Sequence, residues 1–355
     1  MDFSQYQGPV AEWEEFVRST GFAQPPAATI KPQELRTVTN SVRVAGAQKI
    51  LKETPGLLET VTWRDYSILT RDFQNITARV YKPRKPDAES TLLPVQLYFH
   101  GGGYLFGTVE TEDASRARLV ASYPSPGCIV VSVNYRHTPE YSWPTQFNDA
   151  WDSFEWLTAH ISDIGGDPSQ LIVSGISAGA GLAAAVVTKH NELAQADRLN
   201  GLLLIKGQIL CCPWLLHPST NPFPKTEFSS FTQNQLAPVL PWSSLKRFAD
   251  LLGPAAVNDA YFNTALNESE KLKGMPKTCF LVAGQDLLRD EGLTYAEKLK
   301  ENGVPTKVHI FPGLPHGFRI FADLPSGQRW DTVLEENMQW CLSQDTSSSS
   351  HVEIH

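Results

Sequence analysis

The sequence predicts an α/β protein, in which a mostly parallel central sheet carries helices on both faces and a helical cap. Two observations lead to this fold class. Short, continuous apolar runs alternate with helical stretches from about residue 95 to residue 342, as in parallel sheets that are buried on both faces. One stretch, residues 215–265, interrupts the alternation and is rich in Phe, Pro, Ser and Asn. We therefore expect a cap insertion there, over the top of the sheet.

The elements follow in order along the chain. Residues 1–50 are expected to be helical pieces and loops that form the N-terminal part of the cap, and residues 51–344 the main domain. Two early strands are predicted because their residues alternate between apolar and polar. All predicted strands cover residues 61–69, 76–81, 95–99, 128–133, 171–174, 202–211, 278–283 and 307–311. The predicted helices begin near residue 112 and continue with 147–160, 178–193, 290–301 and 329–342. Residues 345–355, with four consecutive serines, are predicted to be a disordered tail.

Bulk composition excludes several classes of protein. The chain has 355 residues, 41% hydrophobic and 19% charged, which is typical of a globular enzyme-sized domain. A formal net charge of -8 disfavours nucleic acid as a partner. The longest apolar run, 202–216, is interrupted by polar residues and is too short to span a membrane. No basic region followed by an apolar stretch begins the sequence, so we expect a cytoplasmic location.

Cysteine usage indicates neither disulfides nor a metal centre. The number of cysteines, five, is odd, and their spacing matches no metal-binding pattern. Free cysteine is among the most buried residue types, so we expect reduced thiols in the core and no bound metal.

A candidate nucleophile lies in Gly175-Ile176-Ser177-Ala178-Gly179, between a predicted strand and a predicted helix. A serine in such a sharp turn needs strained backbone geometry, for which the flanking glycines make room. The N-terminus of the following helix favours negative charge near the serine. The alternative is a small-residue turn at a tight contact between strand and helix.

A glycine-rich loop precedes this turn. His100-Gly101-Gly102-Gly103 follows the strand at 95–99, and successive glycines let backbone N–H groups approach a ligand closely. An enzyme that transfers acyl groups needs such donors for the oxyanion of its tetrahedral intermediate. We expect His100 itself to support the loop rather than to act as a base.

A serine hydroxyl needs a base, and a neutral histidine needs an orienting carboxylate. Asp286 directly follows the strand at 278–283, and His316 follows the last predicted strand. Asp290 and Glu291 are rivals of Asp286, but they fall at a helix start and suit capping. His309 is the rival of His316, but it lies inside a strand pattern.

Five motifs in order give the chain its resemblance to a known family. They are His100–Gly103, Tyr135-Arg136-His137-Thr138-Pro139-Glu140, Gly175–Gly179, Asp286-Leu287-Leu288-Arg289-Asp290-Glu291 and His316-Gly317-Phe318. Together they resemble the hormone-sensitive-lipase-like branch of the α/β-hydrolase fold over about residues 60–340. Two positions depart from its pattern: Ile176 stands where Asp or Thr is usual, and Ala180 where Gly is usual.

The resemblance implies a serine esterase with its catalytic domain at 51–344. Ser177, Asp286 and His316 would be the catalytic residues. Backbone N–H groups of three residues would form the oxyanion hole, namely Gly102, Gly103 and Ala178. No metal or organic cofactor is implied.

The two segments expected to form the cap are rich in aromatic residues, which favours an apolar or ring-containing ester as the small-molecule substrate. These residues are Trp13, Phe16, Phe22, Trp214, Phe223, Phe228, Phe231, Trp242 and Phe248. The predicted substrate contacts are Ile176, Trp214 and Phe318. Exposed aromatics also suit contact with a second copy of the chain. Two alternatives stay open: another reaction on the same scaffold, such as lactone opening, acyl transfer or a lyase or cyclisation step, and a non-catalytic binder of small molecules.

Overall fold

The computed structural model describes residues 2–22, 30–84, 92–220, 222, 226–321, 324–344 and 351–355. Within these residues one sheet has nine strands in the order β1-β2-β4-β3-β5-β6-β7-β8-β9. The pairs β1–β2 and β2–β4 are antiparallel, and all other pairs are parallel. The strands are β1 Val61–Leu69, β2 Asn75–Pro83, β3 Leu93–Phe99, β4 Ile129–Asn134, β5 Gly166–Ile176, β6 Ile205–Cys211, β7 Lys277–Gln285, β8 Thr306–Pro315 and β9 His351–Ile354. The predicted fold class is confirmed.

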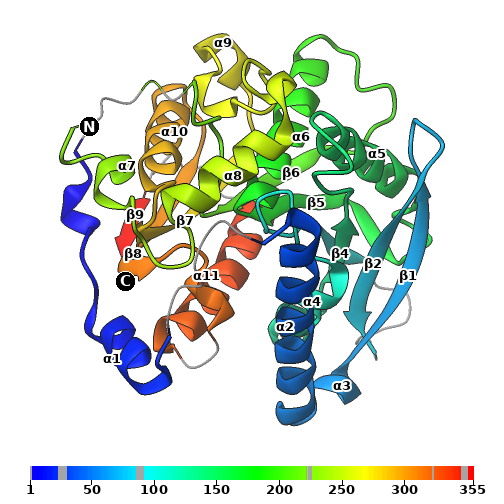
Figure 1. Ribbon diagram of the computed structural model, residues 1–355. Coiled ribbons are helices and arrows are strands. Elements are labelled where there is room, and N and C mark those ends of the chain that lie inside the picture. Colours follow the sequence, from blue (N-terminus) through cyan, green and yellow to red (C-terminus); the bar gives the residue numbers. More distant parts are fainter. Residues whose placement is uncertain are drawn as a thin grey trace.

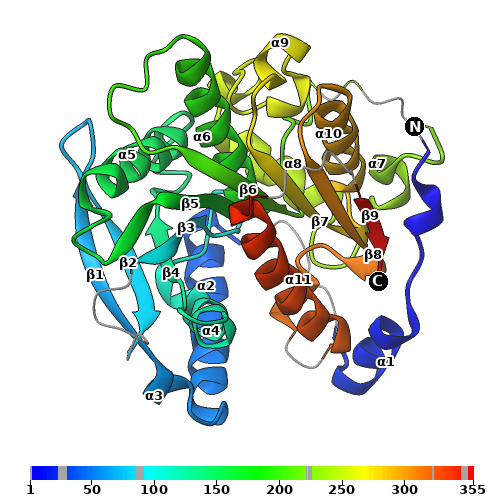
Figure 2. The same ribbon diagram turned by 180° about the vertical axis from the view of Figure 1, so that it is seen from behind.

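Helices cover both faces of the sheet (Figures 1 and 2). On one face α4 contacts β2 and β4, and α11 contacts β5, β6 and β7; on the other, α6 and α10 pack on the strands, with α5 against α6. The helices are α1 Ala11–Thr20, α2 Pro32–Glu53, α3 Leu57–Thr60, α4 Val109–Ser122, α5 Thr145–His160, α6 Ala178–Gln195, α7 Ser230–Gln233, α8 Trp242–Leu252, α9 Ser269–Leu272, α10 Arg289–Glu301 and α11 Pro325–Leu342.

Burial on both faces explains the continuous apolar strands. All seven residues of β3 are buried, and six of them are apolar or aromatic. Gln96 is the polar exception, and it is fully buried. The five cysteines are also buried and form no disulfide, in agreement with the prediction of core thiols. No helix in the described ranges is both long and apolar enough to cross a bilayer.

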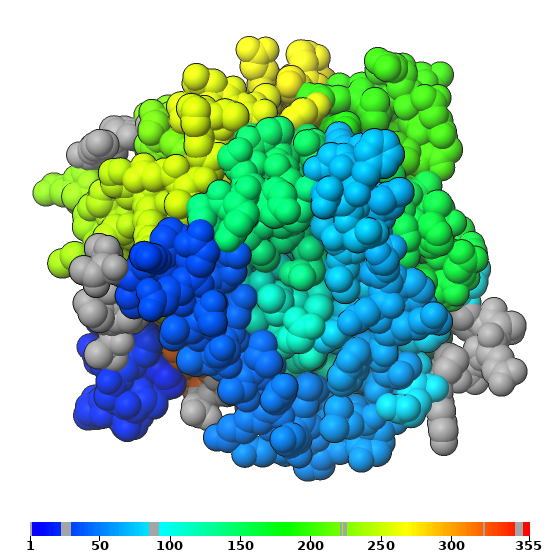
Figure 3. All heavy atoms as spheres, turned by 45° about the vertical axis from the view of Figure 1, so that its right-hand side comes forward, coloured from blue at the N-terminus to red at the C-terminus, as the bar shows by residue number. Residues whose placement is uncertain are grey.

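Two segments far apart in sequence meet at the carboxyl ends of the strands. Helix α2 packs on α4, and its Asn40 side chain accepts a hydrogen bond from the backbone of Gly107 at 2.8 Å. Arg247 of α8 donates to the backbone oxygen of Ile30, and Figure 3 shows the dark-blue N-terminal segment beside the yellow-green segment that includes α8. Helix α2 runs to Glu53. It therefore crosses the boundary that we expected at residue 50.

The end of the chain corrects one prediction. Residues 351–354, expected in a disordered tail, form β9 and pair in parallel with β8. Side chains explain why this short strand is held: Arg329 of α11 pairs with Glu353 at 3.0 Å, and the ring of His355 stacks on Phe311. Residues 345–350, the remainder of the predicted tail, lie outside the described residues.

Acid is expected to destabilise the protein through His309, which is 3% exposed beneath β9. Burial lowers the pKa of His309 to about 4, against the nearby Glu353 charge, which raises it. Between about pH 6.5 and pH 4 the unfolded chain therefore binds more protons than the folded protein. As the pH is lowered through this window, the free energy of unfolding decreases, by up to about 3 kcal/mol. Urea unfolding at pH 7.5 and pH 4.5 measures the change. His309→Gln should show a smaller loss, and an equal loss in both proteins would contradict this role.

Candidate active site

The turn after β5 places Ser177 in a strained conformation. Its φ is +57° and its ψ is -122°, a backbone geometry that a residue with a side chain rarely adopts. The backbone N–H of Ser177 donates to Cys211 at 2.8 Å, which ties the turn to β6. No larger residue fits at the flanking glycines. A Cβ on Gly175 would lie 2.2 Å from the backbone oxygen of Gly179, and one on Gly179 would lie 2.1 Å from the backbone oxygen of Phe99. The sequence therefore folds into the sharp elbow that its glycines predict.

Three side chains from three strand ends form one hydrogen-bonded line. The Nδ1 atom of His316 lies 2.7 Å from Oδ2 of Asp286, and its Nε2 lies 2.9 Å from Oγ of Ser177. Because a carboxylate only accepts, Nδ1 carries the proton and Nε2 accepts from the serine hydroxyl. The other oxygen of Asp286 accepts from the backbone of Leu288 at 3.0 Å, which fixes the carboxylate. All three side chains are buried, with Asp286 at 0% exposure.

The rival residues lie elsewhere. His309 contacts Asn337 and His355 at the edge of the sheet. Asp290 accepts from the backbone of Ser230 at 2.7 Å, and Glu291 accepts from Leu215. These acids thus hold the cap insertion at the start of α10, although we expected them to cap that helix.

The glycine loop lies directly beside the serine. A Cβ on Gly101 would be 3.4 Å from Cβ of Ser177, and Gly103, with a φ of +60°, would press a Cβ into the ring of Phe248 in α8. His100 is buried and stacks on Tyr135 at 4.4 Å between ring centroids. Burial lowers the pKa of His100, so the ring is neutral. Ala178 is the first residue of α6, where a backbone N–H has no partner within the helix.

A cavity of about 440 Å³ opens onto this line of residues. Its walls come from α2, the glycine loop, α4, the elbow, the cap near Val239 and Phe248, and the segment from His316 to α11. Ile176, one of the three predicted substrate contacts, is on this wall.

The other two predicted contacts, Trp214 and Phe318, are core residues instead. They are 1% and 0% exposed, and neither is among the described residues that line the cavity. Trp214 donates from Nε1 to the oxygen of Leu216 at 2.7 Å and packs on Phe262. Phe318 packs on the rings of Phe311 and Trp330. Of the described aromatic residues in the cap insertion, Phe248 is the one that lines the cavity.

Among the described residues, two groups of side chains have the residue types of a metal site. The group of Cys212, Asp286 and His316 overlaps the hydrogen-bonded line, in which His316 already engages both ring nitrogens. Burial, reinforced by the Asp286 charge, raises the pKa of the Cys212 thiol well above its usual value, so this sulfur stays protonated. The second group, at the edge of the sheet, joins Glu353 and His355 to His309.

Comparisons with known proteins agree with this geometry. A family model described as the α/β hydrolase fold matches residues 96–320. Esterase LipI of Mycobacterium tuberculosis is 34% identical over 246 residues, which cover 68% of this chain and 71% of that protein. Carboxylesterase NlhH of the same organism is 32% identical over 287 residues, covering 79% of this chain and 83% of that protein.

Solved structures extend the likeness to nearly the whole chain. Vibralactone cyclase is similar with a TM-score of 0.84 and 26% identity, over 96% of this chain and 97% of that one. The carboxylesterase EstE1 is similar with a TM-score of 0.75 and 30% identity, over 88% of this chain and 98% of that one. The chain therefore belongs to the hormone-sensitive-lipase-like family of the α/β hydrolases, as its motifs predict.

Proposed function

We propose that this chain is a carboxylesterase that hydrolyses an ester through an acyl-enzyme intermediate. The observation that carries the proposal is the hydrogen-bonded line from Asp286 through His316 to Ser177, which opens into the cavity. A nucleophile, a base and an orienting carboxylate within hydrogen-bonding distance are what acyl transfer requires. The esterase names of the relatives support the same reaction class.

In the first half-reaction the Ser177 oxygen attacks the ester carbonyl carbon while His316 Nε2 takes the hydroxyl proton. Backbone N–H groups of Gly102, Gly103 and Ala178 would stabilise the oxyanion that develops. The carbon–oxygen bond to the alcohol then breaks, and His316 gives its proton to the leaving oxygen. Asp286 remains ionised and stabilises the imidazolium.

In the second half-reaction water replaces the alcohol. The water oxygen attacks the acyl carbon while His316 takes a proton from the water. His316 then returns a proton to the Ser177 oxygen as the carboxylic acid leaves. One ester and one water thus yield one acid and one alcohol. The cavity of about 440 Å³ suits a small apolar or ring-containing ester, or a short to medium acyl chain.

Cyclisation or acyl transfer is a second candidate, because vibralactone cyclase is similar over nearly the full length. Such a reaction would keep the acyl-enzyme and replace water by a hydroxyl group of the substrate. The oxygen of isotopically labelled water would then be missing from the product. A non-catalytic binder is less well supported, since such a protein needs no aligned base.

Labelling with a fluorophosphonate probe is the test of the proposal. We expect covalent modification at Ser177 and turnover of p-nitrophenyl esters that falls as the acyl chain outgrows the cavity. Peptide mapping locates the label, and absorbance follows hydrolysis. Labelling without turnover would favour the second candidate, and a folded protein that is not labelled would contradict a serine hydrolase.

A further inference from the structure

The same cavity holds a buried arginine that has no ion pair. Arg116 of α4 lines the cavity and is 7% exposed. Its guanidinium lies 3.9 Å from the ring centroid of Tyr98, and its nearest polar partners are the neutral side chains of Gln96 at 3.4 Å and Ser115 at 3.3 Å. No carboxylate oxygen of the described residues lies within 4.0 Å of it. Glu112 and Asp331 act on this guanidinium only from beyond 4.0 Å. A buried charge without a direct partner is costly, so its presence on a cavity wall calls for an explanation.

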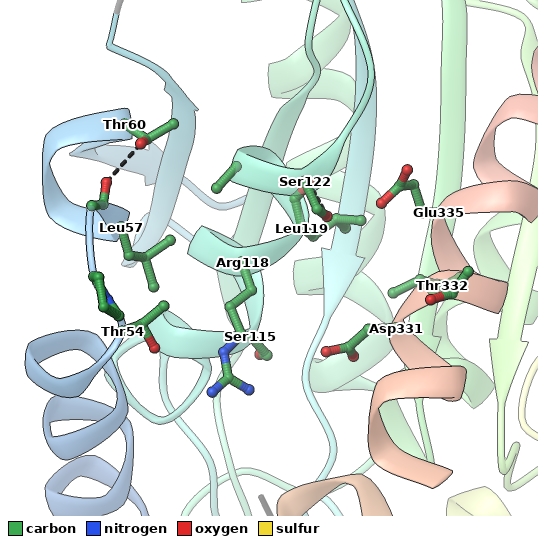
Figure 4. A pocket seen from close by; sticks show the side chains of 14 residues that line it. Thr54, Leu57, Thr60, Ser115, Arg118, Leu119, Ser122, Asp331, Thr332 and Glu335 are labelled. Atoms are coloured by element: carbon green, nitrogen blue, oxygen red, sulfur yellow. Dashed lines mark hydrogen bonds between the residues drawn. The ribbon is translucent and has the colours of Figure 1, made fainter. Parts of the chain in front are cut away.

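A second unpaired guanidinium lies on the same wall. Arg43 of α2 is partly buried and lies 4.8 Å above the ring of Phe106, and it too has no ion pair within the described part of the chain. Asp331 is a counter-charge of the other two arginines on the wall, and it also acts on Arg116 from beyond 4.0 Å. Arg319 forms an ion pair with Asp331. Figure 4 shows Arg118 of α4 and Asp331 of α11 both reaching into an adjoining groove of about 480 Å³.

The surrounding groups leave this wall positively charged. Glu112 is the one other carboxylate among the described lining residues, and its Oε2 accepts from the hydroxyl of Tyr98 at 2.9 Å. Burial raises the pKa of Tyr98 well above its usual value and that of Cys211 to about 12, so neither side chain ionises at neutral pH. Among the described lining residues, the two carboxylates of Glu112 and Asp331 therefore stand against four guanidiniums.

Unused hydrogen-bond capacity lies beside the guanidiniums. The hydroxyl of Ser174 is on the cavity wall, is buried, and has no hydrogen-bond partner. The Nε2 atom of Gln96, whose oxygen faces Arg116, also has none. Each buried polar atom without a partner calls for an explanation, and a polar ligand in the cavity would supply one.

The position of this wall relative to the nucleophile follows from the sheet. Ser174 lies in β5, three residues before Ser177, and it pairs with Tyr98 in β3. A strand rises about 3.3 Å per residue, so the Cα atoms of Ser174 and Ser177 lie within roughly 10 Å of each other, and both residues line the cavity. A single ligand in the cavity can therefore reach both.

We propose that Arg116 and Arg43 form a carboxylate-binding subsite, and that the substrate is an ester with a free carboxylate remote from the scissile bond. The proposal rests on the esterase function proposed above. A guanidinium donates two parallel hydrogen bonds to a carboxylate, and Ser174 can donate a third. The carboxylate can belong to the acyl part or to the alcohol part of the ester.

The test compares charged and neutral esters of equal length. The monomethyl and dimethyl esters of dicarboxylic acids of increasing length place the charge on the acyl part. The acetyl esters of hydroxy acids, with and without a methyl ester, place it on the alcohol part. For one of the two series we expect kcat/KM to favour the charged ester at an intermediate length, by about tenfold to a hundredfold, as for hydrogen bonds to charged groups.

Variants assign the preference to residues. Arg116→Gln and Arg43→Gln should each lower the ratio of charged to neutral kcat/KM about tenfold or more. Arg64→Gln is the matched control: this arginine also stacks on a tyrosine, Tyr66 at 5.2 Å, but is exposed on β1 and outside the cavity. Its ratio should equal that of the unmodified protein. If Arg116→Gln does not fold, Arg43→Gln carries the test, because α2 exposes part of that side chain.

Two results would overturn the subsite. One is an unmodified enzyme that prefers the neutral ester at every length in both series, and the other is an unchanged ratio in the folded arginine variants. Failure of the esterase function looks different: neither these esters nor p-nitrophenyl butyrate would be hydrolysed, and the subsite would fall with it.

Discussion

Replacing Ser177 by alanine is expected to lower kcat for ester hydrolysis about a millionfold, to the rate that oxyanion binding alone sustains. The hydroxyl oxygen of Ser177 would form the bond to the acyl group. Its hydrogen bond to His316 at 2.9 Å shows that a base already faces it. The measurement is the initial rate of p-nitrophenyl butyrate hydrolysis, together with loss of fluorophosphonate labelling.

The fold should survive this change, because alanine keeps the Cβ and accepts the same positive φ as serine. Circular dichroism and the thermal midpoint should stay close to those of the unmodified protein. Ser132→Ala is a control for the loss of a buried serine hydroxyl: Ser132 in β4 is fully buried, its hydroxyl has no partner, and it does not line the cavity. Retained activity in folded Ser177→Ala would remove Ser177 from the mechanism.

The three residues of the hydrogen-bonded line could be predicted because each is fixed by local sequence. Glycines around Ser177 allow only a sharp turn at the end of a strand. Asp286 and His316 each follow or end a strand, and the carboxyl ends of neighbouring parallel strands meet at one edge of the sheet. The predicted strands and their order along the chain were thus sufficient to predict that the three residues lie together.

The cavity wall could not be predicted in the same way. An aromatic residue near a site can face the ligand or the core, and a single sequence does not distinguish the two. Trp214 turns inward because its indole N–H finds the oxygen of Leu216. Phe318 turns inward because Phe311 and Trp330 receive its ring.

Contacts between side chains that are far apart in sequence account for the other features that the sequence did not predict. The serine-rich tail composition predicted disorder up to the last residue, but β9 is held by contacts to residues at least 24 positions away, such as the ion pair between Glu353 and Arg329. Arg116 is similar: within α4 it reads as an ordinary helix cation, and its burial against Tyr98 and Gln96 appears only once β3 lies beneath it. Local patterns carry no record of such partners.

Replacing His316 by alanine should be nearly as damaging as the loss of Ser177, at about 10⁵- to 10⁶-fold in kcat, because residues of such a unit fail together. Without the imidazole, the serine proton has no acceptor and the leaving alcohol has no donor. The double variant Ser177→Ala/His316→Ala should then be hardly slower than either single variant, and initial rates on p-nitrophenyl butyrate measure all three.

His309→Ala is the decisive comparison, because this second histidine lies in β8, only seven residues before His316, and is also buried. Its ring contacts Asn337 and His355 rather than Ser177. We therefore expect kcat within about threefold of the unmodified enzyme, with the cost appearing in the free energy of unfolding instead, as for other buried truncations. If kcat collapsed in folded His309→Ala while His316→Ala stayed active, the base would be His309 and the assignment of His316 would be wrong. The opposite pattern would show that each histidine acts through what it touches: His316, just after β8, contacts the nucleophile, and His309, within β8, contacts α11 and the residue that follows β9.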